Sequence, residues 1–368
     1  APAPAPGAIV YEAPQVLAFS SGRPSDCFGE RFRPFDGDRF IARLPRPPYQ
    51  FQDRTTILEG ALGEQRVGTT AEAEYTVPPD AWYFDADRQP RMPYAVLLEA
   101  VLQSCGFVSA FMGSALLSDE PLKYRNLGGR FRQHRVVDRA SGLLTSTARV
   151  TKINRSGGMI LHHFDMSVRD RWGLVLEGDT YFGFFHPRAL ADQVGVRDVT
   201  PYAPGAAERA AAASFPMPDR APLPTPRWRM VDRITALTTA GGPHGLGFVE
   251  GETDVDASAW FFQAHFLGDP VWPGSLGLES MLQLLKVFAE TRWGVDARTV
   301  FATPALGVEH SWTYRGQVTP ENRLVTTQAW ITGVDDARRR LTADGILSVD
   351  GRIIYQMAGY TLDVLLDD

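Results

Sequence analysis

Residues 260–283 read WFFQAHFLGDPVWPGSLGLESMLQ, and this stretch decides the fold. A histidine, His265, precedes a loop rich in glycine and proline, and the loop leads into an apolar segment with one acid, Glu279. The loop composition predicts a shaped, irregular turn. Beyond the loop, apolar residues recur at i, i+3, i+4 and i+7, which is typical of a helix that starts after Pro273.

The same arrangement occurs earlier in the chain, at residues 80–103, DAWYFDADRQPRMPYAVLLEAVLQ. The matched pairs include Trp82/Trp260, Pro93/Pro273, Glu99/Glu279, Gln103/Gln283, Arg135/Arg315, Leu144/Leu324 and Thr147/Thr327. From the proline onward the offset is constant at 180 residues (273 − 93). A register kept over this length identifies the chain as a duplicated unit.

Tracts rich in proline and alanine mark the boundaries of the two copies. PYAPGAAERAAAASFPMPDRAPLPTP (201–226) lacks an apolar period and predicts a linker that crosses the surface. The opening APAPAP resembles a polyproline spacer, and such spacers often join the domains of multienzymes. The expected organisation is a linker and lead-in (1–28), a first unit (29–195), a linker (196–226) and a second unit (227–368).

Both copies have the same order of predicted elements. An amphipathic strand comes first, near 51–59 and 230–238, and a short strand, the long helix and three β segments follow. Alternating Thr, Val, Ile and Tyr between Gly, Asp and Asn turns indicates antiparallel hairpins. The helix is too apolar for a surface position, so we expect each sheet to wrap its own helix in an α+β fold with two layers side by side.

The composition argues against several classes of protein. The chain has 368 residues and a net charge of −6, and it has no Lys/Arg-rich run, so we expect no nucleic-acid partner. No stretch approaches 18 apolar residues, and the N-terminus lacks a signal-peptide pattern, so we expect no membrane span. Only Cys27 and Cys105 occur, without metal-site spacing, which favours a reduced, cytoplasmic setting and no bound metal.

The two acids stand where their helices should be apolar. Glu279 lies between LGL and SML, and Glu99 lies between VLL and AVL. A buried, unpaired carboxylate is costly, so its recurrence in both copies argues for a role. At the predicted helix start, the free N–H groups of Gly274 and Ser275 could donate to the oxygen of a polarised carbonyl. His265 is open to two interpretations, a satisfied histidine in an aromatic cluster or a functional base.

These residues resemble a known signature. HFLGDPVWPGSLGLESMLQ resembles the motif of the hotdog-fold β-hydroxyacyl-acyl-carrier-protein dehydratases, especially the member that also isomerises its product. That motif places an acid six residues after the proline, as Glu279 and Glu99 stand after Pro273 and Pro93. The E-x-x-x-Q spacing is similar to the acid motif of polyketide-synthase dehydratases. The double unit and NRSGGMILHHFD…GDTYFGFFHP resemble the dehydratase regions of polyunsaturated fatty acid synthases.

The resemblance implies a double hotdog in which two units pair and each site combines the histidine of one unit with the acid of the other. The complete site would then be His265 with Glu99. In the first unit Asp87 stands at the histidine position and the loop is two residues shorter, with Tyr94 where the second unit has Gly274. The resemblance therefore implies that Asp87 and Glu279 form a degenerate second site.

The resemblance also implies roles and partners. His265 would take the C2 proton of a 3-hydroxyacyl thioester, Glu99 would protonate the leaving hydroxyl, and the helix start at Gly274 and Ser275 would stabilise the enolate. Supporting residues would be Gln103, Gly268, Asp269 and Pro273, with Asp269 shaping the loop by turn hydrogen bonds. No cofactor is expected beyond the phosphopantetheine of an acyl carrier protein. Neighbouring synthase domains are the other expected partners, and a homodimer of the pseudo-dimer is left open.

Other candidates and functions stay open at this point. His162 and His163 are adjacent in a predicted strand and face opposite sides, so they cannot both line one site. The arginine run 338–340 fits a solvated hairpin end better than a carrier-binding patch. A hotdog thioesterase and a non-catalytic acyl-binding module are the alternatives to a dehydratase. Isomerase activity is also open, because the isomerising member has Asp where this chain has Glu.

Overall fold

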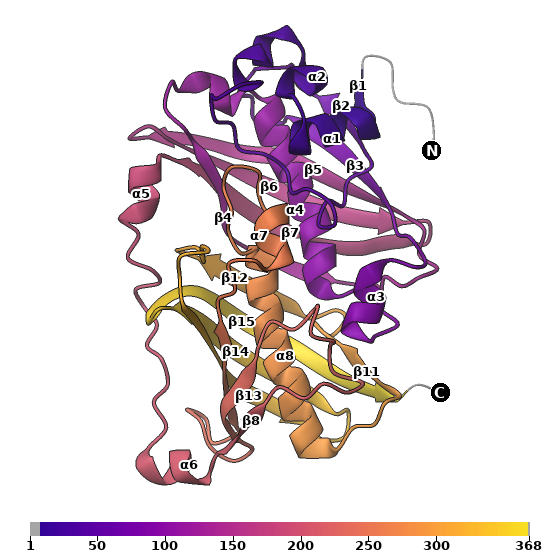
Figure 1. The fold of residues 1–368 in the computed structure, drawn as a ribbon. Coiled ribbons are helices and arrows are strands. Elements are labelled where there is room, and N and C mark those ends of the chain that lie inside the picture. Colours follow the sequence, from indigo (N-terminus) through magenta and orange to yellow (C-terminus); the bar gives the residue numbers. More distant parts are fainter. Residues whose placement is uncertain (1–7, 367–368) are drawn as a thin grey trace.

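The computed structural model describes residues 8–366, and two similar units follow one another in it (Figure 1). The first unit contains β2 (Arg54–Glu59), β3 (Thr70–Thr76), α3 (Trp82–Asp87), α4 (Tyr94–Phe111), η2 (Ser114–Leu117), β4 (Lys123–Gln133), β5 (Leu143–Ser156), β6 (Met159–Asp170) and β7 (Gly173–Phe185). The second contains β9 (Arg233–Thr238), β10 (Phe248–Asp254), α7 (Trp260–Ala264), α8 (Gly274–Trp293), β11 (Thr299–Ala302), β12 (Glu309–Tyr314), β13 (Leu324–Asp335), β14 (Arg340–Val349) and β15 (Arg352–Leu366).

The strands of both units form one antiparallel sheet. With β1 (Ile9–Tyr11) and β8 (Ala213–Pro216) at its edges, its order is β1-β2-β3-β5-β6-β7-β4 in the first unit, continuing through β12-β15-β14-β13-β10-β9-β8 in the second. The join is the antiparallel pair β4 and β12, with Ser311 opposite Arg130. Strand order in one unit therefore mirrors strand order in the other around this join, as expected for a duplicated chain that pairs with itself.

The long helices form the core of each unit. α4 packs on β3, β5 and β6, whereas α8 packs on β10, β13, β14 and β15, and the two helices contact each other. Figure 1 shows α4 against the magenta strands in the upper half and α8 against the yellow strands below. Nearly every residue of α4 is buried, because the sheet curls around it. The fold is a double hotdog, which confirms the predicted α+β class and the expected wrapping of each helix.

Among residues 8–366, α4 is the helix that has the length and apolar character of a membrane span, with 18 residues and a mean hydropathy of 1.5. Inside the protein 94% of that window is buried. The apolar character of α4 is therefore accounted for by its position as a core helix.

The segment expected as N-terminal lead-in is a folded part of the first unit. Residues 1–7, with the proline-rich opening, lie outside the described residues. After them β1 (Ile9–Tyr11) pairs with β2, and α1 (Ala13–Ser21), α2 (Pro24–Phe28) and η1 (Glu30–Phe35) follow. Val16, Phe19 and Phe28 from this segment are buried in the main apolar core. Burial of these apolar side chains, which the sequence patterns did not reveal, holds the segment in place.

The segment between the units is also more ordered than a linker. It contains α5 (Pro187–Ala191), α6 (Ala206–Ala211) and β8 (Ala213–Pro216), and β8 pairs with β9 at the edge of the second unit. Leu223 near its end is fully buried. β8 thus occupies the same place in the second unit as β1 in the first, so each copy receives its edge strand from the segment before it.

Candidate active site

A cavity lies where the two units meet. It has a volume of about 710 Å³, its open mouth included, and is lined by α4, β4, β12 and the loop before α8. His265 from the second unit and Glu99 from the first both line it, together with Gln103, Gly274 and Ser275. Asp87 and Glu279 are not among its lining residues. The structure therefore places the predicted histidine and the predicted acid of the opposite unit around one space.

The loop before α8 fixes the orientation and tautomer of His265. His265 ends α7 and is 8% exposed. Its Nδ1 lies 3.0 Å from the carbonyl oxygen of Val271, whose own N–H donates to the His265 carbonyl at 2.8 Å. Because Nδ1–H must donate to that carbonyl, Nε2 carries the free lone pair. Burial lowers the pKa of His265 to about 3, so the ring is neutral at physiological pH and can accept a proton.

Glu99 is held by groups from both units. Ser275, in the first turn of α8, donates its hydroxyl to Glu99 Oε2 at 2.8 Å, and Gln103 Nε2 donates to Oε1 at 3.3 Å. Behind Ser275, the hydroxyl of buried Tyr49 lies 3.0 Å from the serine oxygen. Burial raises the pKa of Glu99 to about 7, although both hydrogen bonds favour the carboxylate. An acid of this kind can hold a proton near neutral pH and release it to a leaving group.

Gln103 fixes the acid to the first unit. Its Oε1 accepts the backbone N–H of Phe51 at 2.8 Å, and its Nε2 also donates to the carbonyl of Tyr49 at 2.8 Å. These bonds tie the side chain to the segment leading into β2. Gln103 is thereby placed as a support for Glu99, the position in which the sequence analysis expected it.

The start of α8 faces the same cavity. Pro273 is the N-cap and Gly274 the first helical residue, so the first N–H groups have no partner within the helix. A side chain at position 274 would meet the ring of Tyr314, since an added Cβ would lie 2.8 Å from its Cε2. The glycine therefore allows Tyr314 to pack directly on the helix end.

Asp269 does more than shape its own loop. Its carboxylate lies 2.8 Å from Lys123 Nζ, and Arg125 donates to both carboxylate oxygens at 2.7 Å and 2.9 Å. The two cations belong to β4 of the first unit. The turn hydrogen bonds expected of Asp269 come from its backbone, whose N–H donates to the Phe266 carbonyl at 3.1 Å and whose carbonyl accepts the Phe266 N–H at 3.0 Å. Its side chain instead binds the two cations of β4, a strand that was not predicted. Gly268, with a φ of +74°, supplies the left-handed residue of the turn itself.

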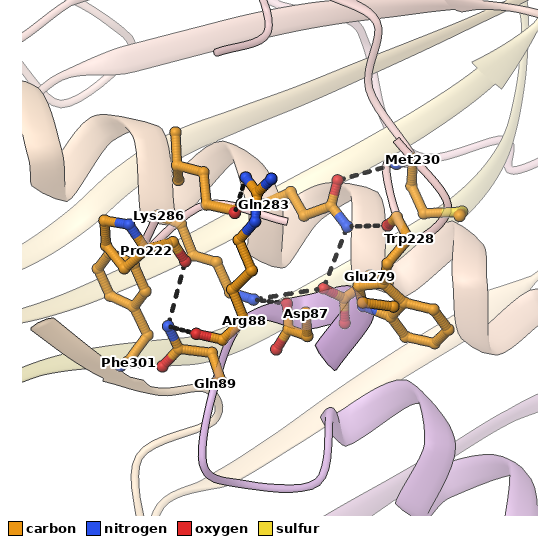
Figure 2. A network of polar contacts seen from close by, with 12 residues as sticks. Asp87, Arg88, Gln89, Pro222, Trp228, Met230, Glu279, Gln283, Lys286 and Phe301 are labelled. Atoms are coloured by element: carbon orange, nitrogen blue, oxygen red, sulfur yellow. Dashed lines mark hydrogen bonds and ion pairs between the residues drawn. The ribbon is translucent and has the colours of Figure 1, made fainter. Parts of the chain in front are cut away.

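The predicted degenerate site is filled by a buried lysine (Figure 2). Lys286 of α8 lies 2.6 Å from Asp87 Oδ1 and 3.6 Å from Glu279 Oε1, and the three side chains are at most 4% exposed. Gln283 donates to Glu279 Oε1 at 3.3 Å, the same distance as between Gln103 and Glu99. The hydrogen bond from glutamine to the acid is thus the same in both units. The difference is that the Asp87–Lys286 salt bridge stands where the other site has His265.

This lysine cluster, Asp87–Lys286–Glu279, is close to electrically neutral. Burial alone would lower the pKa of Lys286, but Asp87 and Glu279 together raise it, so the ammonium keeps its charge. Burial raises the pKa of Glu279 to about 7 against the attraction of Lys286. Sequence analysis missed this lysine, although a lone cation in an apolar helix is a signal for a buried partner. At the equivalent position, 180 residues earlier, the first unit has Gly106, which lines the cavity.

The remaining candidates do not join the site. His162 is buried between Ser109 and Gln65, at 2.9 Å from each, while His163 faces the other side and stacks on Tyr181. The prediction that these histidines face opposite ways is confirmed.

Neither the arginine run 338–340 nor the two cysteines line the cavity. Arg340 pairs with Asp363 at 2.6 Å, so it is engaged within its own sheet. Cys27 and Cys105 are both buried free thiols. Within the described range, no group of three or more His, Cys, Asp or Glu side chains could hold a metal ion.

Comparison with known proteins gives a family match in both units. The family model described as FabA-like domain matches residues 44–172 and again residues 223–358. One of the subunits of a polyunsaturated fatty acid synthase from Thraustochytrium sp. (strain ATCC 26185 / S-3) is 28% identical over 379 aligned residues. The match covers 93% of this chain and 25% of that relative, so the chain spans a quarter of the relative's length.

Solved structures with a similar fold include dehydratase domains and thioesterases. A dehydratase domain of a trans-AT polyketide synthase from Brevibacillus brevis has 13% identity and a TM-score of 0.48, covering 83% of this chain and 96% of that one. A putative oleoyl thioesterase from Lactobacillus plantarum has 10% identity and the same TM-score, covering 84% and 100%. At these scores the likenesses do not distinguish the two activities.

Proposed function

The chain belongs to the FabA-like domain family, and on that premise we propose that it dehydrates 3-hydroxyacyl thioesters to trans-2-enoyl thioesters. The observation that supports this most directly is the cavity between the units. It is lined by neutral His265 from one unit and by Glu99, an acid with a pKa of about 7, from the other. Removal of water across C2–C3 needs a base that takes the C2 proton and an acid that protonates the C3 hydroxyl, and this pair supplies both.

The mechanism follows from the atoms available. His265 Nε2 accepts the C2 proton, and the electron pair moves toward the thioester carbonyl, whose oxygen gains negative charge. As the C3–O bond breaks, Glu99 gives its proton to the departing hydroxyl, which leaves as water. The free N–H groups at the start of α8, at Gly274 above all, stabilise the carbonyl oxygen while it carries charge.

The carrier and the setting are further parts of the proposal. The substrate is carried on the phosphopantetheine of an acyl carrier protein, which enters by the cavity mouth, and no other cofactor takes part. The matched relative is named as part of a polyunsaturated fatty acid synthase, which supports a place among the domains of such a synthase. The two buried free thiols are compatible with a reducing, cytoplasmic setting.

Three variants test the proposal by hydration of a short trans-2-enoyl thioester, followed as loss of the conjugated absorbance. His265→Ala and Glu99→Gln should each lower kcat by about 10²–10⁴-fold, because each removes one proton-transfer group. Glu279→Gln is the matched control, since it makes the same change in the equivalent residue of the other unit. It should keep most of the activity.

The opposite pattern, with Glu279→Gln inactive and Glu99→Gln active, would show that the cross-unit pairing is wrong. Release of free thiol from a saturated acyl thioester, with no hydration of the enoyl thioester, would show a thioesterase instead.

A further inference from the structure

The tyrosine at the end of β12, Tyr314, carries a hydroxyl that nothing in the described part of the chain uses. The side chain is 4% exposed and lines the cavity between the units. Its ring packs on Tyr355, with ring centroids 4.5 Å apart. Among residues 8–366 its hydroxyl has no hydrogen-bond partner. A buried hydroxyl without a partner destabilises the fold, and phenylalanine at the same position would avoid that cost.

Two other buried tyrosines, which bond across the two units, do have partners. Tyr49 bonds to Ser275 at 3.0 Å, and Tyr94 bonds to His310. A second buried donor without a described partner, the indole N–H of Trp272, belongs to a residue that lines the same cavity. Two buried donors without a described partner, both on residues that line this cavity, fit a ligand that brings acceptor oxygens to them.

The position of Tyr314 indicates which oxygen it would meet. Gly274, the first residue of α8, lies directly against it, because a Cβ added there would be 3.1 Å from the Tyr314 hydroxyl. The hydroxyl therefore adjoins the free N–H groups of the helix start, where a negative oxygen is favoured. Burial above all, with Tyr355 and other neighbours that include Glu99, raises the pKa of Tyr314 well above its usual value. It stays a donor at any physiological pH.

The first unit provides an internal comparison. The residue equivalent to Gly274 is Tyr94, and the residue equivalent to Tyr314 is His134. His134 is not fully buried, and its Nε2 pairs with Glu177 at 2.9 Å. The combination of an open helix start and an unpartnered tyrosine thus occurs in the unit that carries His265, and the unit with Asp87 lacks it.

We propose that Tyr314 is a further catalytic residue, which donates its hydroxyl to the carbonyl oxygen of the acyl thioester beside the N–H groups at the start of α8. This inference rests on the proposed function. When His265 takes the C2 proton, negative charge develops on that oxygen, and the Tyr314 bond strengthens at that moment. Tyr314 keeps its own proton, so the proton balance between His265 and Glu99 is unchanged.

The test is Tyr314→Phe, with Tyr360→Phe as its matched control. Tyr360 is also a fully buried tyrosine of the second unit whose hydroxyl has no described partner, but it does not line the cavity. In hydration of a trans-2-enoyl thioester, Tyr314→Phe should lower kcat on the order of 10²-fold with KM nearly unchanged, because an oxyanion donor acts in the transition state. Tyr360→Phe should keep the kcat of the unaltered protein.

Thermal unfolding separates this role from a structural one. Tyr314→Phe removes no described hydrogen bond from the protein without substrate, so its Tm should equal that of the unaltered protein or exceed it.

Three results would overturn the inference: full kcat in Tyr314→Phe, a change confined to KM, or an equal loss in Tyr360→Phe. If the unaltered protein itself does not hydrate the enoyl thioester, the proposed function fails instead, and the two failures are distinct.

Discussion

Replacement of Lys286 by methionine tests the lysine cluster at the degenerate site. Methionine keeps much of the length and flexibility of the side chain but carries no charge. The substitution therefore leaves Asp87 and Glu279 without their cation while the packing of α8 changes little. The cavity with His265 and Glu99 is not touched, so the folded variant should still hydrate an enoyl thioester.

The magnitude follows from burial and distance. Lys286 Nζ lies 2.6 Å from Asp87 and 3.6 Å from Glu279, and none of the three side chains is more than 4% exposed. Loss of one partner from a buried ion pair costs about 3–5 kcal/mol, because the remaining charge has neither water nor a counter-ion. At pH 8 we expect the free energy of unfolding to fall by that amount.

The loss should depend on pH with a definite sign. Burial raises the pKa of Glu279 from 4.5 to about 7 even beside the lysine. Because Lys286 lowers the pKa values of both Glu279 and Asp87, its removal raises both pKa values further. A carboxyl group with a raised pKa in the folded state stabilises the fold below its unfolded pKa and loses that contribution as the pH rises through its folded pKa. The deficit of the variant should therefore be largest above about pH 7 and smallest near pH 4.5.

Urea unfolding at pH 8 and pH 5, followed by tryptophan fluorescence, measures this difference. The matched control adds Asp87→Leu and Glu279→Gln to Lys286→Met and should recover most of the loss, because no buried charge is left. A loss below about 1 kcal/mol at pH 8, the range of an exposed pair, or an equal loss at both pH values would show that Lys286 does not stabilise the fold as the cation of a buried ion pair.

Three further predictions concern the cavity. Ser275→Ala removes a hydrogen bond that lowers the pKa of Glu99. In the dehydration direction, which needs protonated Glu99, the alkaline limb of kcat/KM against pH should therefore move upward, and an unmoved limb would contradict this. Gly106→Lys introduces the lysine of the degenerate site into the cavity wall. Hydration by the folded variant should fall by about 10²-fold or more, whereas normal activity would show that the substrate does not use this wall. Arg125→Met removes the ion pair with Asp269 and makes the loop that carries His265 more mobile. The kcat should therefore fall by up to about 10²-fold while KM changes less, and a change in KM alone would argue against this role.

The duplicated helices were the part of the fold that the sequence predicted best. α4 begins at Tyr94 and α8 at Gly274, which keeps the offset of 180 residues found between the aligned motifs. Such helices are recognisable because proline, apolar period and a single acid lie within one short window. The antiparallel hairpins after them were likewise predicted from alternation and turn residues.

The strands that join the units were missed. β4 reads KYRNLGGRFRQ, with two adjacent glycines and several cations, so it lacks the β-branched alternation that marks a strand. Gly128 and Gly129 are needed because a Cβ at either would collide with the backbone or ring of Trp312 on β12 or with a neighbouring strand. Pairing with the other copy, rather than local propensity, fixes this strand, and sequence patterns do not show such pairing.

The candidate site was predicted only in part, because contacts between the two copies are not visible in local sequence patterns. His265 and Glu99 could be named because the motif and its repeat are local patterns. Other features of the site depend on which side chains of one copy meet the other. They are the contact of Ser275 with Glu99, the contact of Lys286 with Asp87, and the place of Tyr314 in the cavity wall. The hydrogen bond between Ser275 and Glu99, for example, joins residues 176 positions apart in the chain, and such contacts appear only with the tertiary structure.

The pairing of β4 with β12 has a consequence for how such an enzyme behaves on dilution. A two-chain dimer that shares its sites loses them when the two chains separate, so its specific activity falls below the dissociation constant. Here both halves of the site are tethered by one chain and a continuous sheet, which keeps their effective concentration high at any dilution. The proposed function therefore predicts that activity per chain stays constant down to the lowest concentration that can be assayed, and that an active-site titrant is consumed at one equivalent per chain.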